Sequence, residues 1–579
     1  MHQPNSPSRR RFIQTVTTVA VAGPLGLTGC GGGDDNDDDG SDAAITGATF
    51  THGVASGDPL ADRVILWTRA VPQGEATAVT LSFEMALDEA FSAVVASGAV
   101  TASAEEDYTA KVDATGLAPN TVYFYRFAAG ESRSVTGRTK TLPQGPVEQV
   151  RLAMFSCSNY PAGFFHVYGE AALRDDLDAA LHLGDYLYEG GNGDYATEDA
   201  EALGRVPEPP VEILSLADYR TRFAQYRSDP DLQEFHRLIP VISVWDDHEV
   251  ANDSYVSGAE NHDPDEGDYI TRRDAALRAY QEWMPVRPAV EGQPQNLYRR
   301  FDFGDLASFY FLETRLTARD LQLQLTDYLD PATGLVDEAR FTADLTDPNR
   351  TMLGAEQLGW LQNQLADSQA TWQVLGQQVL MGRMNLPAPL LIDLALPGAG
   401  VSLTEYQALL QQAFTAPDTL TPEQQAILAQ PAVPYNLDAW DGYPAEREAL
   451  LATALQLDKN LLVLAGDTHN AWANNLQDQA GNAVGVEFAT ASVSSPGLEN
   501  FISDAPAAVA QAFTDFIEPL QYADTENLVY FVLTLTPERA EGEWIFVDTV
   551  KSMDYRVLEE AGQRLAVLPG AANRALVPA

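Results

Sequence analysis

The sequence predicts an α/β fold preceded by a small all-β domain. From about residue 147 short apolar runs alternate with helical patterns, whereas residues 47–145 hold only alternating apolar segments separated by turns. Strands that alternate with helices form a sheet covered by helices. A length of 579 residues also exceeds what one simple core needs, so we expect two domains or one domain with large insertions.

Residues 47–145 have the pattern of half-buried strands. The clearest segments are VILWTRAV (64–71), AVTLSFEMAL (78–87) and VYFYRFAAG (122–130), separated by Pro, Gly and Asn turns. The stretch LAPNTVYFYRF places a turn before strand aromatics, which is typical of fibronectin-like sandwiches. We therefore expect a β-sandwich domain at 47–145, with a boundary at PQGP (143–146).

Residues 146–579 form the expected α/β core. Strands are indicated at VRLAMFSC (150–157), the run ending in HLGD (182–185), LIPVISVWDDHE (238–249), FDFGDLASFYFLETR (301–315), WQVLGQQVLM (372–381) and LLVLAGDTH (461–469). Helices are indicated at 169–180 and 356–368, and a C-terminal hairpin at 527–550. Segment 385–435, rich in Pro, Gln and Ala, is expected to be an insertion that partly covers a site.

The first residues have the features of a targeting segment. Paired arginines precede Phe12 and a short apolar run, as in a twin-arginine export signal, which we place at 1–29. The run closes with LTGC (27–30), a lipoprotein-type cleavage box that would leave Cys30 as a lipid anchor; an ordinary small-residue cleavage site is the alternative. Residues 30–46, rich in Gly and Asp, are expected to be a tether. The protein would then be exported, periplasmic or at the cell surface.

Charge argues against nucleic-acid binding, and the cysteine content leaves the role of the Cys157 thiol open. A net charge of −48 argues against nucleic-acid binding as a primary role, because phosphate backbones require Lys and Arg stripes. The chain has 2 cysteines. If Cys30 carries lipid, Cys157 has no partner for a disulfide. Its thiol is then either buried and inert or held by a metal.

Four apolar runs end in residues that can bind metals. These residues are Cys157, Asp185 with Tyr188, the run Asp246-Asp247-His248-Glu249, and Asp467 with His469. Ligands of α/β sheets collect at the carboxyl ends of strands, so the four ends could converge. A thiolate, a phenolate, an imidazole and a carboxylate together suit trivalent iron. The remaining carboxylates and Asn252 suit Ca²⁺ or Mg²⁺, and the two oxygens of Asp185 could bridge two ions.

Several motifs resemble those of PhoD-like alkaline phosphatases, within the metallophosphoesterases and related to purple acid phosphatases. They are FTHGVASGDPLADRVILWTR (50–69), FSCSNYPAG (155–163), LHLGDYLYEGG (181–191), VWDDHEVANDS (244–254), GAENH (258–262), MPVR (284–287), MLGAEQLGWL (352–361), WDGY (440–443) and LAGDTHNAW (464–472). The resemblance spans about residues 50–550; Glu313 and the 385–435 insertion depart from it. It implies a four-layer α/β/β/α sandwich after the β domain.

The same resemblance implies one Fe³⁺ and two Ca²⁺. The implied iron ligands are Cys157, Asp185, Tyr188 and His469, and the implied calcium ligands are Asp185, Asp467, Asp247 and the weaker candidate Asn252. His248 would stabilise the transition state or protonate the leaving group; the alternative is a hydrogen bond that orients Asp247. His182, Tyr186 and Glu189 are expected to be structural.

The expected activity is hydrolysis of small phosphate monoesters, and also of diesters, by a hydroxide that the metals activate. An alternative is a phosphodiesterase or phospholipase D-like enzyme. An alternative of another class is a catalytically inactive lipoprotein that binds ligands at the surface. The expected partners are small phosphoesters, the twin-arginine export machinery and, through Cys30, a membrane.

Overall fold

The computed structural model describes residues 47–287, 293–396, 398–559 and 561–579, which belong to one compact unit. The export signal (1–29), the tether (30–46) and Cys30 lie outside the described residues. Within the described ranges no helix has the length and apolar character needed to cross a membrane.

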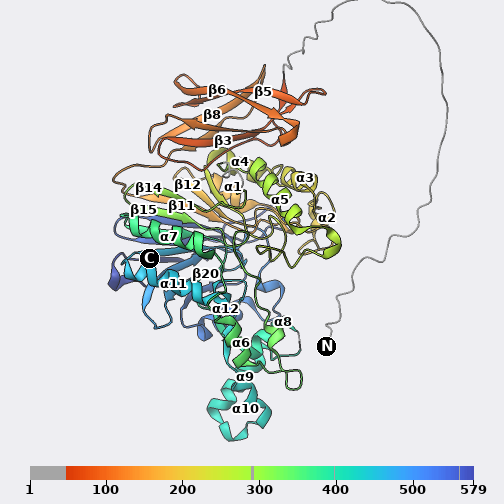
Figure 1. Cartoon of the computed structure of the whole chain (residues 1–579), viewed down its shortest axis with the longest axis vertical. Coiled ribbons are helices and arrows are strands. Elements are labelled where there is room, and N and C mark those ends of the chain that lie inside the picture. The colour runs from red at the N-terminus through yellow and green to blue at the C-terminus, as the bar shows by residue number, and fades with distance from the viewer. Residues whose placement is uncertain (1–46, 288–292, 397, 560) are drawn as a thin grey trace, which may run out of the picture. The chain divides into compact units, whose positions relative to one another are not determined.

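Two large mixed sheets form the centre of the fold (Figure 1). The first has ten strands in the order β26-β25-β24-β23-β11-β12-β13-β2-β3-β7, and the second has seven in the order β14-β15-β16-β19-β21-β20-β22. In the first sheet β11 (Val150–Phe155), β12 (Ala179–Leu183) and β13 (Val241–Val244) are parallel neighbours, and in the second β15 (Ala307–Phe311), β16 (Trp372–Gly376), β19 (Leu461–Ala465) and β21 (Ala483–Ala489) are parallel. The other strands are β2 (Val54–Gly57), β3 (Arg63–Arg69), β7 (Thr109–Thr115), β14 (Arg299–Phe303), β20 (Ala471–Gln477), β22 (Leu520–Asp524), β23 (Leu528–Leu535), β24 (Ala540–Val547), β25 (Arg564–Val567) and β26 (Val577–Pro578).

The two sheets pack face to face, and helices cover their outer faces. Phe488 of β21 contacts Phe531 of β23 (ring centroids 5.4 Å apart) and Trp544 of β24 (5.8 Å) across the interface. On the other face of the first sheet, the ring of Phe155 lies 4.9 Å, centroid to centroid, from those of Tyr168 in α1 (His166–Ala172) and Phe235 in α4 (Pro230–Leu238). Figure 1 shows α7 (Gly354–Asp367) and α11 (Pro444–Gln456) on the side of the second sheet. The arrangement confirms the predicted four-layer α/β/β/α fold.

The helices described are short for the most part. Their bounds are α1 (His166–Ala172), α2 (Ala200–Leu203), α3 (Leu216–Tyr226), α4 (Pro230–Leu238), α5 (Tyr269–Trp283), α6 (Glu338–Leu345), α7 (Gly354–Asp367), α8 (Ala388–Ala395), α9 (Leu403–Thr415), α10 (Pro422–Leu428), α11 (Pro444–Gln456) and α12 (Pro506–Phe516). The helix expected at 169–180 is α1, which ends earlier. The chain then turns so that the Asp178 carboxylate accepts a hydrogen bond from the backbone N–H of Arg151 (2.7 Å).

The strand expected at 301–315 is instead a hairpin of β14 and β15. Gly304 lies in its turn with φ +57°, a backbone conformation that glycine adopts without steric cost. The hairpin expected at 527–550 is present as β23 and β24.

The N-terminal strands form a sandwich that is joined to the core. A sheet of β5 (Ala78–Ala86), β6 (Val94–Ser103), β8 (Val122–Ala129) and β10 (Gly137–Lys140), with β9 (Ser132–Arg133) at β8, packs on β2, β3 and β7. Strand β2 also meets β13, where Gly57 pairs with Val241. A Cβ at residue 57 would lie 2.3 Å from the Pro285 carbonyl oxygen, so only glycine allows this approach. The pair β1 (Ala48–Thr49) and β4 (Val71–Pro72) borders the sandwich.

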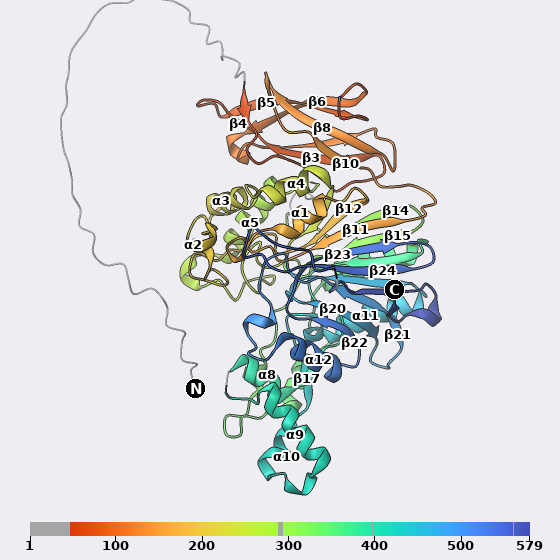
Figure 2. The same ribbon diagram turned by 180° about the vertical axis from the view of Figure 1, so that it is seen from behind.

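Segment 385–435 is an excursion closed by a two-stranded ladder. Strands β17 (Asn385–Pro387) and β18 (Ala432–Pro434) pair antiparallel and enclose α8, α9 and α10. Ser402 and Thr421 begin α9 and α10 with capping boxes, in which each side chain accepts from a backbone N–H of the first turn. Figures 1 and 2 show α9 and α10 projecting away from the two sheets.

Candidate metal centre

The four strand ends singled out in the sequence converge. Strands β11, β12 and β13 are parallel neighbours, so their carboxyl ends bring Cys157, Asp185 and the loop at Asp246 to one edge. The end of β19 in the second sheet adds Asp467 and His469. The potential ligands form three groups, and within each group the ligand atoms lie within 4.8 Å of one another. The groups are Cys157, Asp185 and His469; Asp185, Asp247 and His248; and Asp246, Asp247 and Asp467. The first and second groups share Asp185, and the second and third share Asp247.

Backbone conformation at these strand ends is unusual. Cys157, Asp185, Asp467 and His469 have φ values of 61°, 54°, 65° and 61°. The left-handed region is uncommon for residues other than glycine and costs about 1–3 kcal/mol each time. Four such residues in one cluster indicate that the fold holds these side chains in place against a local cost, as functional sites do.

Gly184 allows the ends of β12 and β13 to approach each other. It has φ +104°, and a Cβ at this position would lie 2.4 Å from the Cβ of Asp246. Any larger residue would displace Asp246, so this glycine sets the spacing between Asp185 and the acidic loop.

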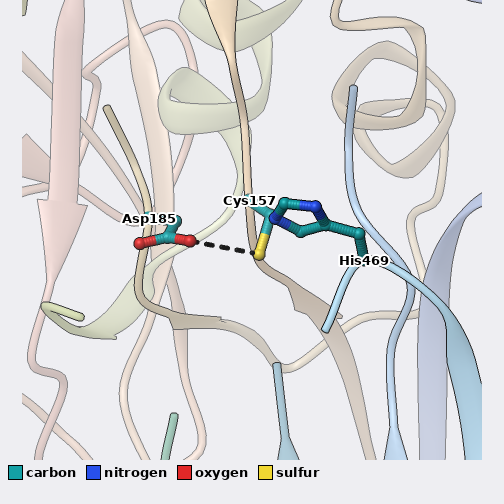
Figure 3. A group of neighbouring side chains, drawn as sticks. All are labelled: Cys157, Asp185 and His469. Carbon is teal, nitrogen blue, oxygen red and sulfur yellow. Dashed lines mark hydrogen bonds between the residues drawn. The ribbon is translucent and has the colours of Figure 1, made fainter. Parts of the chain in front are cut away.

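The thiol, phenol and imidazole surround one oxygen of Asp185. Sγ of Cys157 lies 3.4 Å and the phenol oxygen of Tyr188 lies 3.2 Å from Oδ2 of Asp185, and Figure 3 shows Asp185 and His469 directed toward Cys157. Nε2 of His469 is 3.1 Å from the Tyr188 oxygen. The other ring nitrogen, Nδ1, donates to the Pro496 carbonyl (2.9 Å). That contact directs Nε2 toward the cluster.

The electrostatics of this group favour a bound cation. Burial, with the nearby Asp185 carboxylate, raises the pKa values of Cys157 and Tyr188 well above their ordinary range. Burial and neighbouring carboxylates also raise the pKa of Asp185, although His248 opposes the shift. Oδ1 of Asp185 and Oδ2 of Asp246 are buried acceptors that no donor of the described residues reaches. A thiol, a phenol and an imidazole around orphaned carboxylate oxygens fit metal ions, whose charge would ionise the thiol and the phenol.

An arginine lies among the carboxylates of the third group. Arg315 is fully buried and pairs with Asp246, with Asp438 (2.8 Å) and with Asp467 (3.4 Å). Despite this arginine, burial raises the pKa of Asp246 to about 7 and that of Asp467 well above its ordinary range. Asp247 accepts from the backbone N–H of Asp253 (2.6 Å). The carboxylates outnumber the buried guanidinium, and the excess negative charge favours oxygen-seeking cations.

His248 is held by a carboxylate that sequence reasoning missed. Its Nδ1 lies 2.6 Å from Oε2 of Glu189, and its ring lies 4.1 Å from the Tyr188 ring, centroid to centroid. Oε1 of Glu189 accepts from the backbone N–H of Asn252 and from Asn261, both at 2.8 Å. Burial alone would lower the pKa of His248, but Glu189, Asp185 and Asp247 together raise it well above its ordinary value. Glu189, expected to be structural, therefore positions the imidazole.

The remaining predicted residue lies at the rim. The Asn252 side-chain amide donates to Glu260 (3.0 Å), and Asn252 lines a cavity of about 700 Å³ together with Tyr188, His248 and His469. His248 contacts Asp247 through its backbone N–H (3.0 Å), not through its ring. His182 and Tyr186 were expected to be structural. In the buried interior His182 is hydrogen-bonded to Tyr168, and Tyr186 is hydrogen-bonded to His236.

A second cavity lies on the side of the site that holds Asp246, Asp467 and Arg315, which is named the carboxylate side. It has a volume of about 460 Å³ and is lined by Asp253, Asp438 and Asp467 together with residues of the 385–435 excursion. Both cavities have the size of small-molecule sites. Arg315, Asp438 and Asp253 were not predicted. Two of them lie in segments that the sequence singled out, since Arg315 is in FDFGDLASFYFLETR (301–315) and Asp253 is in VWDDHEVANDS (244–254).

Comparisons with known proteins identify the family. A family model described as PhoD-like phosphatase matches residues 152–544, and one described as PhoD-like phosphatase, N-terminal domain, matches residues 37–143. The protein named alkaline phosphatase D of Bacillus subtilis (strain 168) is 36% identical over 514 residues, which cover 86% of this chain and 77% of that protein. A solved structure described as the structure of PhoD matches with a TM-score of 0.75 and 32% identity, covering 92% of each chain. The resemblance indicated by the motifs is confirmed.

Proposed function

The chain belongs to the PhoD-like phosphatase family and is a phosphoric ester hydrolase, and on that premise we propose that it releases inorganic phosphate from phosphate monoesters. One observation carries the proposal: ligand atoms from four strand ends converge in three adjoining groups beside an open cavity. Several cations next to one cavity suit phosphoryl transfer, in which charge on the phosphoryl oxygens must be neutralised. Family membership disfavours the alternative of an inactive binding lipoprotein.

The donor types support one Fe³⁺ and two Ca²⁺. The iron ligands in this proposal are Cys157, Asp185, Tyr188 and His469, and the calcium ligands are Asp185, Asp247 and Asp467. Thiolate, phenolate and imidazole favour iron, whereas carboxylates favour calcium. Asn252 donates to Glu260 through its amide nitrogen, which leaves its amide oxygen as the weaker candidate ligand for calcium. When bound, the cations supply Lewis acidity to the phosphoryl group and a water nucleophile that is active near neutral pH.

The protein side chains position the reacting groups. Glu189 holds Nδ1 of His248, which leaves Nε2 to donate a proton to the leaving oxygen or a hydrogen bond to the phosphoryl group. The hydroxyl oxygen of Ser495 lies within hydrogen-bond distance of the Tyr188 oxygen (2.7 Å) and of the Cys157 carbonyl oxygen (3.0 Å), so this one side chain contacts two of the proposed iron ligands. Arg315 forms an ion pair with Asp246 and offsets part of the negative charge on the carboxylate side.

Diester hydrolysis is the second candidate, in a phosphodiesterase or phospholipase D-like enzyme. The cavity beside Asp467 supports it, because a diester needs room for a second substituent next to the phosphoryl group.

The proposal includes the organisation and location inferred from the sequence. The segments are an export signal at 1–29, a tether at 30–46, a β domain at 47–145 and a catalytic domain at 146–579 with the 385–435 insertion. The paired arginines and the LTGC box support export by the twin-arginine route and a lipid anchor on Cys30. The protein would act in the periplasm or at the cell surface.

An assay with p-nitrophenyl phosphate beside its bis-ester, with Ca²⁺ present, tests the activity. Turnover of the monoester supports the first candidate, a dominant rate on the bis-ester supports the second, and no turnover of either contradicts both. Activity that survives exhaustive EGTA treatment would remove calcium from the proposal.

The Tyr188→Phe variant tests the iron assignment. Iron–phenolate coordination gives a visible absorbance band, so the purified protein should be coloured and the variant should lose that band. An unchanged band in Tyr188→Phe would contradict Tyr188 as a ligand. Cys157→Ser should lower the iron content. Full iron retention with full activity in this variant would show that the buried thiol is not a ligand.

A further inference from the structure

An apolar cavity continues from the carboxylate side of the site. The cavity of about 460 Å³ that contains Asp467 is also lined by Leu394 and Phe501, and these two residues line a further cavity of about 230 Å³. Phe501 lines the 700 Å³ cavity at His248 as well. The three spaces therefore adjoin one another around Phe501.

The 230 Å³ cavity, here named the apolar pocket, lies between the excursion and α12. Its walls come from β17, α8, the start of α9, the segment at Phe501 and α12, and they include Leu386, Leu390, Val509, Ala512, Phe513 and Phe516. Its two carboxylates are occupied elsewhere, since Asp393 accepts from the backbone N–H of Gly398 (2.9 Å) and Asp504 accepts from Thr404 (2.8 Å). The pocket thus offers an apolar surface with few free polar groups.

Phe501 is unusual for a residue beside a charged site. Its side chain is 64% exposed, although it stands where all three cavities meet. An exposed aromatic ring at the mouth of an apolar pocket is stabilised when an apolar ligand covers it.

We propose that the substrates are phosphoesters with an alkyl chain, and that this chain lies past Phe501 and Leu394 in the apolar pocket. The inference rests on the proposed phosphoesterase function and names its substrate class. A dry apolar cavity of about 150 Å³ accepts a benzene ring, so the apolar pocket accommodates a larger group. The polar cavity at His248 remains open to water and to the released phosphate.

Chain-length dependence tests the proposal on the full protein with its metals. The n-alkyl phosphates from ethyl to octyl, kept below micelle-forming concentrations, are compared by phosphate release. Each methylene buried in the pocket should raise kcat/KM by up to about fourfold, from the transfer free energy of one CH₂. The matching n-alkyl phosphonates, whose C–P bond resists hydrolysis, should bind more tightly with length in calorimetry, with a negative heat-capacity change.

Two variants and one control locate the effect. Leu394→Gln and Phe501→Ala should flatten the chain-length profile of both kcat/KM and phosphonate affinity. The control Phe414→Ala removes a ring that is 90% exposed on α9 and lines none of the three cavities, so the profile should stay steep.

The two proposals fail in distinguishable ways. A flat profile with turnover of ethyl phosphate and p-nitrophenyl phosphate overturns the alkyl-chain proposal and leaves the phosphatase intact. No turnover of any ester overturns the function itself. A steep profile that Leu394→Gln and Phe501→Ala both leave unchanged would also overturn the assignment to this pocket.

Discussion

The two sides of the candidate metal centre balance their charge differently. On one side Cys157, Tyr188 and His469 surround Asp185, and no arginine or lysine is paired with these groups among the described contacts. On the other side Asp246 and Asp467 share the buried Arg315. The first side is named the thiol side; the second is the carboxylate side.

The difference indicates what each side requires from a metal. On the thiol side burial keeps the thiol and phenol protonated, so a cation must be strong enough to displace two protons. On the carboxylate side Arg315 already compensates part of the charge, so a cation there competes with a guanidinium and is expected to exchange more easily. Strong binding of one ion and weaker binding of others follows from this contrast.

Asp185→Asn should have the largest effect, because Asp185 lies in the thiol-side group and also in the group with Asp247, which connects it to the carboxylate side. Replacing the carboxylate removes a negative charge and one potential bridging oxygen, and activity should fall roughly 10³-fold, equivalent to about 4 kcal/mol. Metal analysis should show loss of iron and calcium together. Loss of only one metal, with the other retained in full, would show that Asp185 serves a single side.

Arg315→Met should change the carboxylate side alone. Removing the arginine leaves buried carboxylates unpaired, and the metal-free protein should lose about 3–5 kcal/mol of unfolding free energy. Calcium no longer competes with the guanidinium, so added Ca²⁺ should raise the melting temperature more in the variant than in the parent protein. The measurement is thermal unfolding in EGTA and in Ca²⁺.

Arg205→Met is the matched control for this variant. Arg205 and Asp229 form a buried pair (2.7 Å) that shares no residue with the candidate ligands. The control should be destabilised in EGTA, and Ca²⁺ should raise its melting temperature no more than that of the parent protein. An equal gain in both variants would mean that calcium acts elsewhere on the protein.

The positions of the strand ends could be predicted, whereas several of their contacts could not. Cys157, Asp185 and Asp467 each follow an apolar run, and parallel strands bring such ends together. Arg315 follows β15 of the other sheet. The segment that contains it was recognised in the sequence, but nothing local shows that its side chain turns inward. Glu189 follows Tyr188 directly, yet its role depends on where the loop at His248 lies. The sequence pattern predicts which residues lie at the end of a strand. Which side chains those residues contact depends on how distant segments pack in the fold.

The same limit applies to the 385–435 excursion. Its composition predicted an insertion, and the capping residues Ser402 and Thr421 explain its helices. The apolar pocket, however, needs Phe513 from α12, about a hundred residues further along the chain. Such a pocket exists only after the excursion and α12 have packed against each other.

Glu189→Gln should have the smallest effect and should leave both sides of the metal centre unchanged. A glutamine can still accept from Asn252 and Asn261, but it no longer stabilises a charged imidazole at Nδ1 of His248. We expect kcat to fall about 10- to 100-fold with little change in KM, because the contact orients a reacting group and not the bound substrate. The visible band and the calcium content should stay as in the parent protein.

Substrates with different leaving groups distinguish the two proposed roles of His248, which are protonation of the leaving oxygen and stabilisation of the phosphoryl group. If Nε2 protonates the leaving oxygen, the loss in Glu189→Gln should be larger for ethyl phosphate, whose alkoxide needs a proton, than for p-nitrophenyl phosphate, whose phenolate leaves unaided. Equal losses on both substrates would assign His248 to phosphoryl stabilisation instead. Glu260→Gln, at an exposed residue that contacts Asn252 but not His248, should change neither rate by more than about twofold. A large loss in that control would place the sensitivity in the Asn252 loop and not in the proton held at His248.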